Sequence, residues 1–287
     1  MATRPLDRTA PQAAATDGDI ESAVIARHRN ERRRSARSTV LLNIAGVCLF
    51  VLIWEAIPRL GLVVNPVLFP PPSKVLSTAI PMILSGEIPH NVLVSLQRAG
   101  IGFALASVLA ISAGLLTARI KLARDLTEPL LHGFRSLPVI ALVPISVLWL
   151  GIGENAKVAL VTLGAFFPIW IGTFIGVRDV HPIYLRSAAC LGATRLQTLL
   201  LVILPAALPF ILAGMRQGIA ISLIVLVAAE LAGATAGVAY MMSMGHQLFR
   251  VDIMFAGLFM LGAMGFAADR LFVAASRRLF PWYRPSA

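Results

Sequence analysis

Long apolar stretches, separated by short polar segments, are the feature that most restricts how this chain can fold. A stretch of roughly 20 apolar residues is long enough to cross a bilayer as an α-helix. Only 14% of the residues are charged and the mean hydropathy is +0.81, whereas about a quarter of a soluble protein is charged. The sequence therefore predicts an all-α polytopic membrane protein with six spans, at about 40–57, 93–118, 126–150, 158–177, 208–231 and 253–274.

The distribution of basic residues predicts the orientation of these spans. Six spans place both termini on one side of the membrane. If that side is the cytoplasm, eighteen of the 25 Lys and Arg residues lie in inner segments and four in outer ones, while Arg98, Arg135 and Arg216 fall within spans. Lys and Arg accumulate in cytoplasmic segments. We therefore expect a multi-pass protein of the cell inner (plasma) membrane, with its N- and C-termini in the cytoplasm.

The membrane domain is expected to occupy residues 40–280, between two cytoplasmic ends. Residues 1–39 are strongly basic and lack hydrophobic periodicity, which predicts a disordered tail that lies beside anionic lipid. No signal peptide is expected, since the first apolar segment comes late and no small-residue cleavage site follows it. Residues 281–287 form the C-terminal end. The proline-rich and amphipathic segment 68–90 is predicted to lie on a membrane surface, and 232–250 to be a loop.

The third and fourth spans, and the segment between them, contain features that predict how they pack. Pro138 and Pro144 interrupt the third span, which predicts a kinked helix that faces other helices. The segment 151–157, GIGENAK, joins two spans and is predicted to be a short hairpin. It is not expected to be a phosphate loop, since it lacks the G-K-[S/T] ending of such a loop. Gly172 and Gly176 in the fourth span have the G-x-x-x-G spacing that lets two helices approach closely.

Ionisable residues inside the membrane are the usual sign of an ion-coupled carrier. Arg98 is predicted to extend to the lipid head groups, and Glu55, Arg216 and Asp269 to be paired or interfacial structural charges. Glu230 lies between small residues in VAAELAG, and the sequence favours a structural role and a role in the solute pathway about equally. None of these residues lies clearly at the middle of a span.

The segment 179–210 is the one long mixed polar and apolar passage, and it predicts two short helices joined by an elbow. Pro182 suits the first turn of a helix, and Gly192 a left-handed helix end. Thr194 and Gln197 have the spacing of a capping box that starts a second helix. Pro205 is expected to end that helix.

The sequence contains no set of residues that supports catalysis, so we expect no enzyme activity. The five His residues are scattered without metal-ligand spacing, and no metal site, disulfide or nucleic-acid module is predicted. Since there is no phosphate-binding loop for ATP, uphill transport would need a separate ATPase or an ion gradient.

The elbow resembles the EAA loop of the permease subunits of ABC importers, the inner-membrane components of binding-protein-dependent transport systems. That pattern is E-A-A, three residues, G, nine residues and then I-x-L-P. Aligned on Gly192, it meets Arg186-Ser187-Ala188 and ends at Leu204-Pro205. Arg186 stands at the position of the family Glu, which reverses the charge there. FPPPSKVL, SLQRAGIGFALA, FRSLPVIALVPISVLWLGIGENAKVAL, FFPIWIGTFIGV and VAAELAGATAGVAYMM are similar to the nitrate, sulfonate and taurine branch, in the same order from Pro70 onward.

The resemblance implies a subunit that forms the pathway for a small anionic solute and binds no cofactor itself. Its implied partners are two cytoplasmic ATPase subunits that hold ATP-Mg, a periplasmic or lipid-anchored solute-binding protein, a second permease copy and membrane lipid. The loop 179–209 would dock on the ATPase, with Leu185, Ala188 and Ala189 as an apolar ridge. The residues implied in coupling are Leu185, Arg186, Ser187, Ala188, Ala189, Gly192, Thr194, Arg195 and Pro205. The alternatives are a stand-alone ion-coupled secondary transporter or channel, and a membrane scaffold or enzyme.

Overall fold

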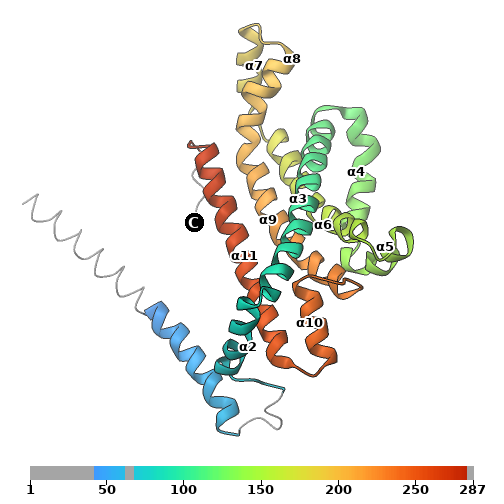
Figure 1. The fold of residues 1–287 in the computed structure, drawn as a ribbon. Helices are drawn as coiled ribbons and strands as arrows, with labels where there is room; N and C mark the ends of the chain where they lie inside the picture. Colours follow the sequence, from blue (N-terminus) through green and yellow to red (C-terminus); the bar gives the residue numbers. More distant parts are fainter. Residues whose placement is uncertain (1–41, 62–67, 283–287) are drawn as a thin grey trace, which may run out of the picture. The chain divides into compact units, whose positions relative to one another are not determined.

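The computed structural model describes residues 42–61 and 68–282, and these are helical apart from short connections (Figure 1). The chain divides into two compact units, Met1–Val64 and Asn65–Ala287. In the first unit, one helix runs from Leu42 to Arg59. Glu55 and Arg59 form an ion pair of 2.5 Å across one turn of it. The predicted tail, 1–39, and the predicted start of the first span lie outside the described residues.

The second unit contains the remaining described helices. They are α2 (Pro72–Leu84), α3 (Glu87–Arg119), α4 (Lys121–Arg135), η1 (Val139–Leu142), α5 (Val143–Leu150), α6 (Glu154–Arg178), α7 (Pro182–Cys190), α8 (Arg195–Thr198), η2 (Leu199–Ile203), α9 (Leu204–Leu231), α10 (Val238–Gln247) and α11 (Val251–Leu279). Over both units, five described helices are long and apolar enough to cross a membrane, or six if one bent pair counts as a span. The predicted all-α, six-span fold class is confirmed.

Helix α6 lies between α3 and α9 and forms the centre of the second unit (Figure 1). Small residues allow this arrangement on the α9 side. A Cβ atom at Gly172 would lie 2.6 Å from the carbonyl oxygen of Phe210, and one at Gly176 would lie 2.8 Å from the Cβ of Phe210. The two backbones can approach this closely only because no side chain lies between them. The close packing predicted from the G-x-x-x-G spacing is confirmed.

The third predicted span is broken. The direction of the chain changes by 88° between α4 and the helical segment Val139–Leu150. Pro138 explains the break, because a proline disfavours the helical conformation in the residue before it. Pro144 causes no kink, since it occupies the first turn of α5, where its missing N–H is not needed. The prediction of one kinked helix is therefore wrong.

Two connections also differ from the prediction. The expected hairpin 151–157 is a loop only as far as Gly153, because Glu154 already begins α6. The expected loop 232–250 contains α10, whose Val238 and Met241 pack against Ile253 and Ala256 of α11. Its first residue follows Gly237, which provides no side-chain cap. The helix is thus stabilised by burial rather than by a local signal that a sequence pattern would show.

Candidate functional site

The elbow of residues 179–210 has the predicted backbone geometry at its glycine. Helix α7 begins at Pro182 and ends at Cys190, and Gly192 has a φ of +73°. The N–H of Gly192 donates to the Ala189 carbonyl and that of Ala193 to the Ala188 carbonyl, each at 3.0 Å. This pair of bonds satisfies the last carbonyls of a helix that ends in a left-handed residue. The predicted helix end is confirmed.

The second helix of the elbow begins with the predicted capping box. The backbone N–H of Thr194 donates to Gln197 Oε1 at 2.8 Å, and the N–H of Gln197 donates to Thr194 Oγ1 at 3.3 Å. Arg195 is the first residue of α8. Two backbone N–H donors at the start of α8 are thereby satisfied inside the elbow. Helix α8 therefore starts as a new helix, separate from α7.

Pro205 does not end this helix, and that prediction is wrong. Residues Leu199–Ile203 form a π-helical turn that leads directly into α9, so one helix continues from Arg195 to Leu231. Pro205 lies in the first turn of α9, just after the π turn. A rearranged hydrogen-bond ladder of this kind accommodates a residue that lacks an N–H. The elbow is therefore joined to α9 without a break.

Helix α7 does not expose the apolar ridge that the sequence predicts for it. Ala188 is buried, and Leu185 packs against a cluster that includes Val177, Ile203 and Ala207. Leu185 thus holds α7 on the start of α9, and neither residue faces outward. The predicted apolar ridge is wrong for these two residues, and only Ala189 of the three is exposed. Arg186, Ser187 and Arg195 are also exposed.

Other apolar side chains form the outer surface of the elbow. On α7, α8 and the turn between them, the exposed large apolar side chains are Ile183, Tyr184, Leu191 and Leu196, which are 58%, 58%, 87% and 64% exposed. We call these four residues the elbow patch. The elbow lies at the end of α9 opposite to α10 (Figure 1). A patch of this kind at the tip of a bundle is typical of a surface that docks on another protein.

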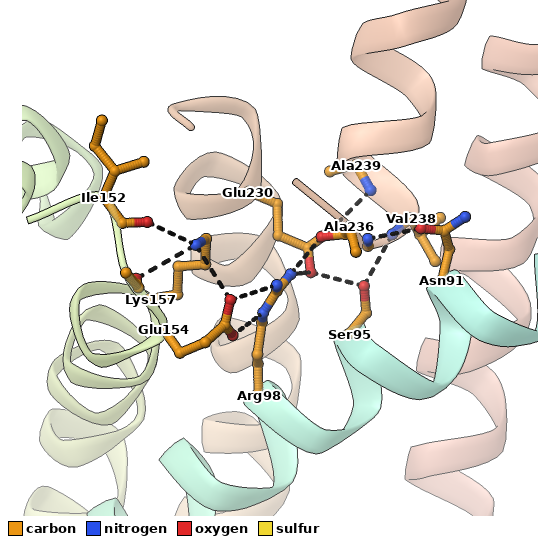
Figure 2. A network of polar contacts seen from close by, with 12 residues as sticks. Asn91, Ser95, Arg98, Ile152, Glu154, Lys157, Glu230, Ala236, Val238 and Ala239 are labelled. Atoms are coloured by element: carbon orange, nitrogen blue, oxygen red, sulfur yellow. Dashed lines mark hydrogen bonds and ion pairs between the residues drawn. The ribbon is translucent and has the colours of Figure 1, made fainter. Parts of the chain in front are cut away.

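Glu230 belongs to a buried polar network at the other end of α9 (Figure 2). It is 1% exposed. Its Oε1 accepts hydrogen bonds from Ser95 Oγ at 2.7 Å and from Arg98 Nη1 at 2.8 Å, and its Oε2 accepts from the N–H of Ala239 at 3.0 Å. A Cβ atom at Gly237 would overlap the carboxylate. The network thus accounts for both oxygens of Glu230 and holds α10 beside them.

Arg98 is the centre of the same network, and the prediction that it extends to the head groups is wrong. It is 4% exposed. Its Nε and Nη2 donate to Glu154 at 2.5 and 2.7 Å, and its Nη1 also donates to the carbonyl of Ala236 at 2.6 Å. A buried charge is tolerated when it is paired and hydrogen-bonded in this way. Ion pairs with Glu154 of α6 and Glu230 of α9 therefore hold the Arg98 side chain inside the bundle, away from the lipid head groups.

The network joins the first half of α3 to the start of α6 and the end of α9. Lys157 extends it, since its Nζ donates to the carbonyl of Ile152 at 3.0 Å and contacts Glu154 at 3.4 Å. These contacts favour a structural role for Glu230, and its role in the solute pathway stays a prediction. Arg216 and Asp269 are paired at 2.6 and 2.9 Å, as the sequence predicts. Within the described residues, no three His, Cys, Asp or Glu side chains are placed to hold a metal ion.

Comparison with known proteins gives concordant matches. Residues 106–281 match the family model described as binding-protein-dependent transport system inner membrane component. The chain is 36% identical over 232 residues to a putative aliphatic sulfonates transport permease protein of Bacillus subtilis, covering 81% of this chain and 84% of that protein. It is 31% identical over 249 residues to the taurine transport system permease protein of Escherichia coli, covering 85% and 90%.

A solved structure shares the fold. It is the crystal structure of an amino acid ABC transporter with histidines, which superposes with a TM-score of 0.53 at 15% identity and covers 72% of this chain and 97% of that chain.

Proposed function

The chain belongs to the family of binding-protein-dependent transport system inner membrane components and is a permease subunit of an ABC importer, and we propose that its solute is a small anion of the sulfonate, taurine or nitrate class. The names of the two relatives support this class, since this chain matches nearly their whole length. The family is one of transport permeases rather than catalytic enzymes.

The elbow is the proposed contact with the ATPase. The observation that carries this proposal is the unbroken helix from Arg195 to Leu231, which joins the exposed elbow patch to the centre of the bundle. A displacement of α8 would therefore move α9, and such a movement supports alternating access. Leu185 and Ala188 would act by holding α7 on α9, whereas Ser187, Ala189 and the elbow patch would contact the ATPase. Gly192, Thr194 and Pro205 would set the shape of the elbow.

The charge of the elbow predicts one property of the partner surface. Arg186 and Arg195 are both exposed on the elbow. Opposite charges across an interface fix orientation and speed association. The ATPase of this importer would therefore carry carboxylates opposite Arg186, where relatives with Glu would meet a basic group.

The family and the charge asymmetry of the sequence support the proposed assembly. Two copies of this permease would form the pathway and two cytoplasmic ATPase subunits would bind ATP-Mg. A periplasmic or lipid-anchored binding protein would deliver the solute. The permease would lie in the cell inner membrane, with the elbow and both termini in the cytoplasm. Most Lys and Arg residues lie in the segments assigned to the cytoplasmic side.

Solute-stimulated ATP hydrolysis tests the solute class. The permease would be purified with its ATPase and binding protein and reconstituted in liposomes, and hydrolysis would be measured with taurine, ethanesulfonate, nitrate and the uncharged solute glycerol. We expect stimulation by at least one of the first three and none by glycerol. Stimulation by an uncharged solute alone would contradict the proposal.

A further inference from the structure

A cleft with a volume of about 520 Å³ lies between α6, α9 and the break that follows α4. Most of its lining is apolar or glycine, including Phe167, Ile171 and Gly172. Two polar side chains, Arg135 and Gln217, also line it. Neither residue belongs to the elbow or to the network around Arg98.

The cleft lies near the middle of the spans. Gln217 is halfway along α9, and Phe167 is halfway along α6. One turn before Arg135, the ring of His132 lies 5.5 Å from the ring of Trp170, which is also in the central part of α6. The last turn of α4 is therefore close to the bilayer midplane, and Arg135 lies at this depth.

Arg135 and Gln217 have no polar partner in the part of the chain that the structure describes. The other two arginines of the spans are paired, since Arg98 contacts two carboxylates and Arg216 contacts Asp269. An arginine inside a membrane is energetically costly and usually faces a pathway or a partner. A guanidinium and a carboxamide that face one cleft without partners thus have their donors available for a ligand.

The backbone at the break supports the same interpretation. Residues Ser136 to Pro138 connect α4 and η1 without continuing either helix. Non-helical backbone at membrane depth is tolerated where it is buried in protein or lines a water-filled cavity. The break and the cleft therefore mark a part of the surface that lipid does not cover in the assembled transporter.

We infer that Arg135 and Gln217 form the subsite that binds the oxyanion head group of the solute within the membrane. The inference rests on the proposed solute class and deepens it. The guanidinium presents two parallel N–H groups that match two oxygens of a sulfonate, and the carboxamide N–H adds a third donor. Phe167 and Ile171 provide an apolar wall for a short aliphatic part. The pathway thus has its own selectivity for anions in addition to that of a binding protein.

Uptake of radiolabelled taurine into proteoliposomes tests this inference. The permease would be reconstituted with its ATPase and binding protein, and initial rates would be measured at saturating taurine. We expect Arg135→Gln to lower the rate at least tenfold, Gln217→Leu to lower it severalfold and Arg135→Lys to retain part of it. Hydrolysis of ATP without solute should stay at the wild-type rate in all three. Arg119→Gln is the matched control, since Arg119 is exposed at the end of α3 and distant from the cleft lining.

The outcomes separate this inference from the proposed function. A wild-type uptake rate in Arg135→Gln, with active wild-type protein, would overturn the subsite and leave the solute class intact. Uptake of glycerol but of no oxyanion by the wild type would overturn both. If Arg135→Gln does not assemble, Arg135→Lys decides, because a lower rate at normal basal hydrolysis supports the subsite and an unchanged rate overturns it.

Discussion

Arg98 and Glu230, which are 132 residues apart in the sequence, form an ion pair of 2.8 Å whose two side chains are 4% and 0% exposed. The pair joins α3 to α9 and lies at the opposite end of α9 from the elbow. Glu154 shares the guanidinium from the start of α6. Ion pairs therefore join α3, α6 and α9 on the side away from the elbow. At the elbow, apolar side chains such as Leu185 and Ile203 make the contacts.

Loss of Arg98 should destabilise the protein more than loss of Glu154. Arg98→Met leaves the carboxylate of Glu230 buried with only Ser95 and the Ala239 N–H as donors, and an unpaired buried charge costs about 3–5 kcal/mol. Glu154→Gln should cost much less, since the Glu154 side chain is 59% exposed. Thermal unfolding in detergent measures both. Equal unfolding midpoints for the two variants would contradict this prediction, because they would show that pairing with Arg98 does not stabilise the buried Glu230.

A methyl group at Gly172 should separate α6 from α9. The added Cβ would lie 2.6 Å from a backbone oxygen, which cannot move aside as a flexible side chain would. Overpacking of this kind costs about 1–3 kcal/mol, so Gly172→Ala should lower the unfolding midpoint. Gly100→Ala is the matched control, since a Cβ atom there meets nothing within 4 Å. That variant should be neutral or slightly stabilised, and a similar loss in both would refute the packing argument.

Gly192 should tolerate Asn but not Val. A Cβ atom at this position meets nothing within 4 Å, so any loss comes from the φ of +73° alone. Asn adopts this conformation more readily than a β-branched residue does. We expect Gly192→Val to remain in the membrane but to lose ATP-driven uptake, and Gly192→Asn to keep most of it. Wild-type uptake in Gly192→Val would mean that the elbow is not the coupling element.

A charge on the elbow patch should release the ATPase. Leu191 is 87% exposed next to Gly192, so Leu191→Asp removes an apolar contact without disturbing the core. We expect less ATPase to co-purify with a tagged permease. Leu279→Asp is the control, because Leu279 is 69% exposed at the end of α11. Equal recovery of the ATPase with Leu191→Asp and wild type would place the docking surface elsewhere.

Local signals in the sequence predict much of the fold and the shape of the elbow. The left-handed Gly192 and the capping box of Thr194 and Gln197 depend on residues within a few positions of one another, so a pattern in one short segment is sufficient. The spans are likewise visible as continuous apolar stretches. The close approach of α6 and α9 at Gly172 follows from spacing within one helix.

Contacts between distant segments are not visible in this way. The sequence predicts Arg98 at the membrane surface, because Glu154 and Glu230 are brought beside it only by the packing of α6 and α9. Pro205 suggests a helix end, but the π turn before it changes which hydrogen bonds are available. Leu185 and Ala188 have the composition of a docking ridge, yet Leu185 packs against Val177 and Ile203, and Ala188 is buried. The errors at Arg98 and Leu185 concern partners that lie elsewhere in the chain, whereas the error at Pro205 concerns a local π turn that the sequence pattern does not show.

The most direct measurement is uptake of a labelled sulfonate by proteoliposomes that contain this permease, with and without its ATPase and ATP. An importer subunit that lacks an ATP-binding loop should move solute only when three components are present. They are the ATPase, ATP on the same side of the membrane as the ATPase, and the binding protein. Imposed proton or sodium gradients should have no effect on uptake. Uptake by the permease alone, driven by such a gradient, would contradict the account and identify a secondary transporter.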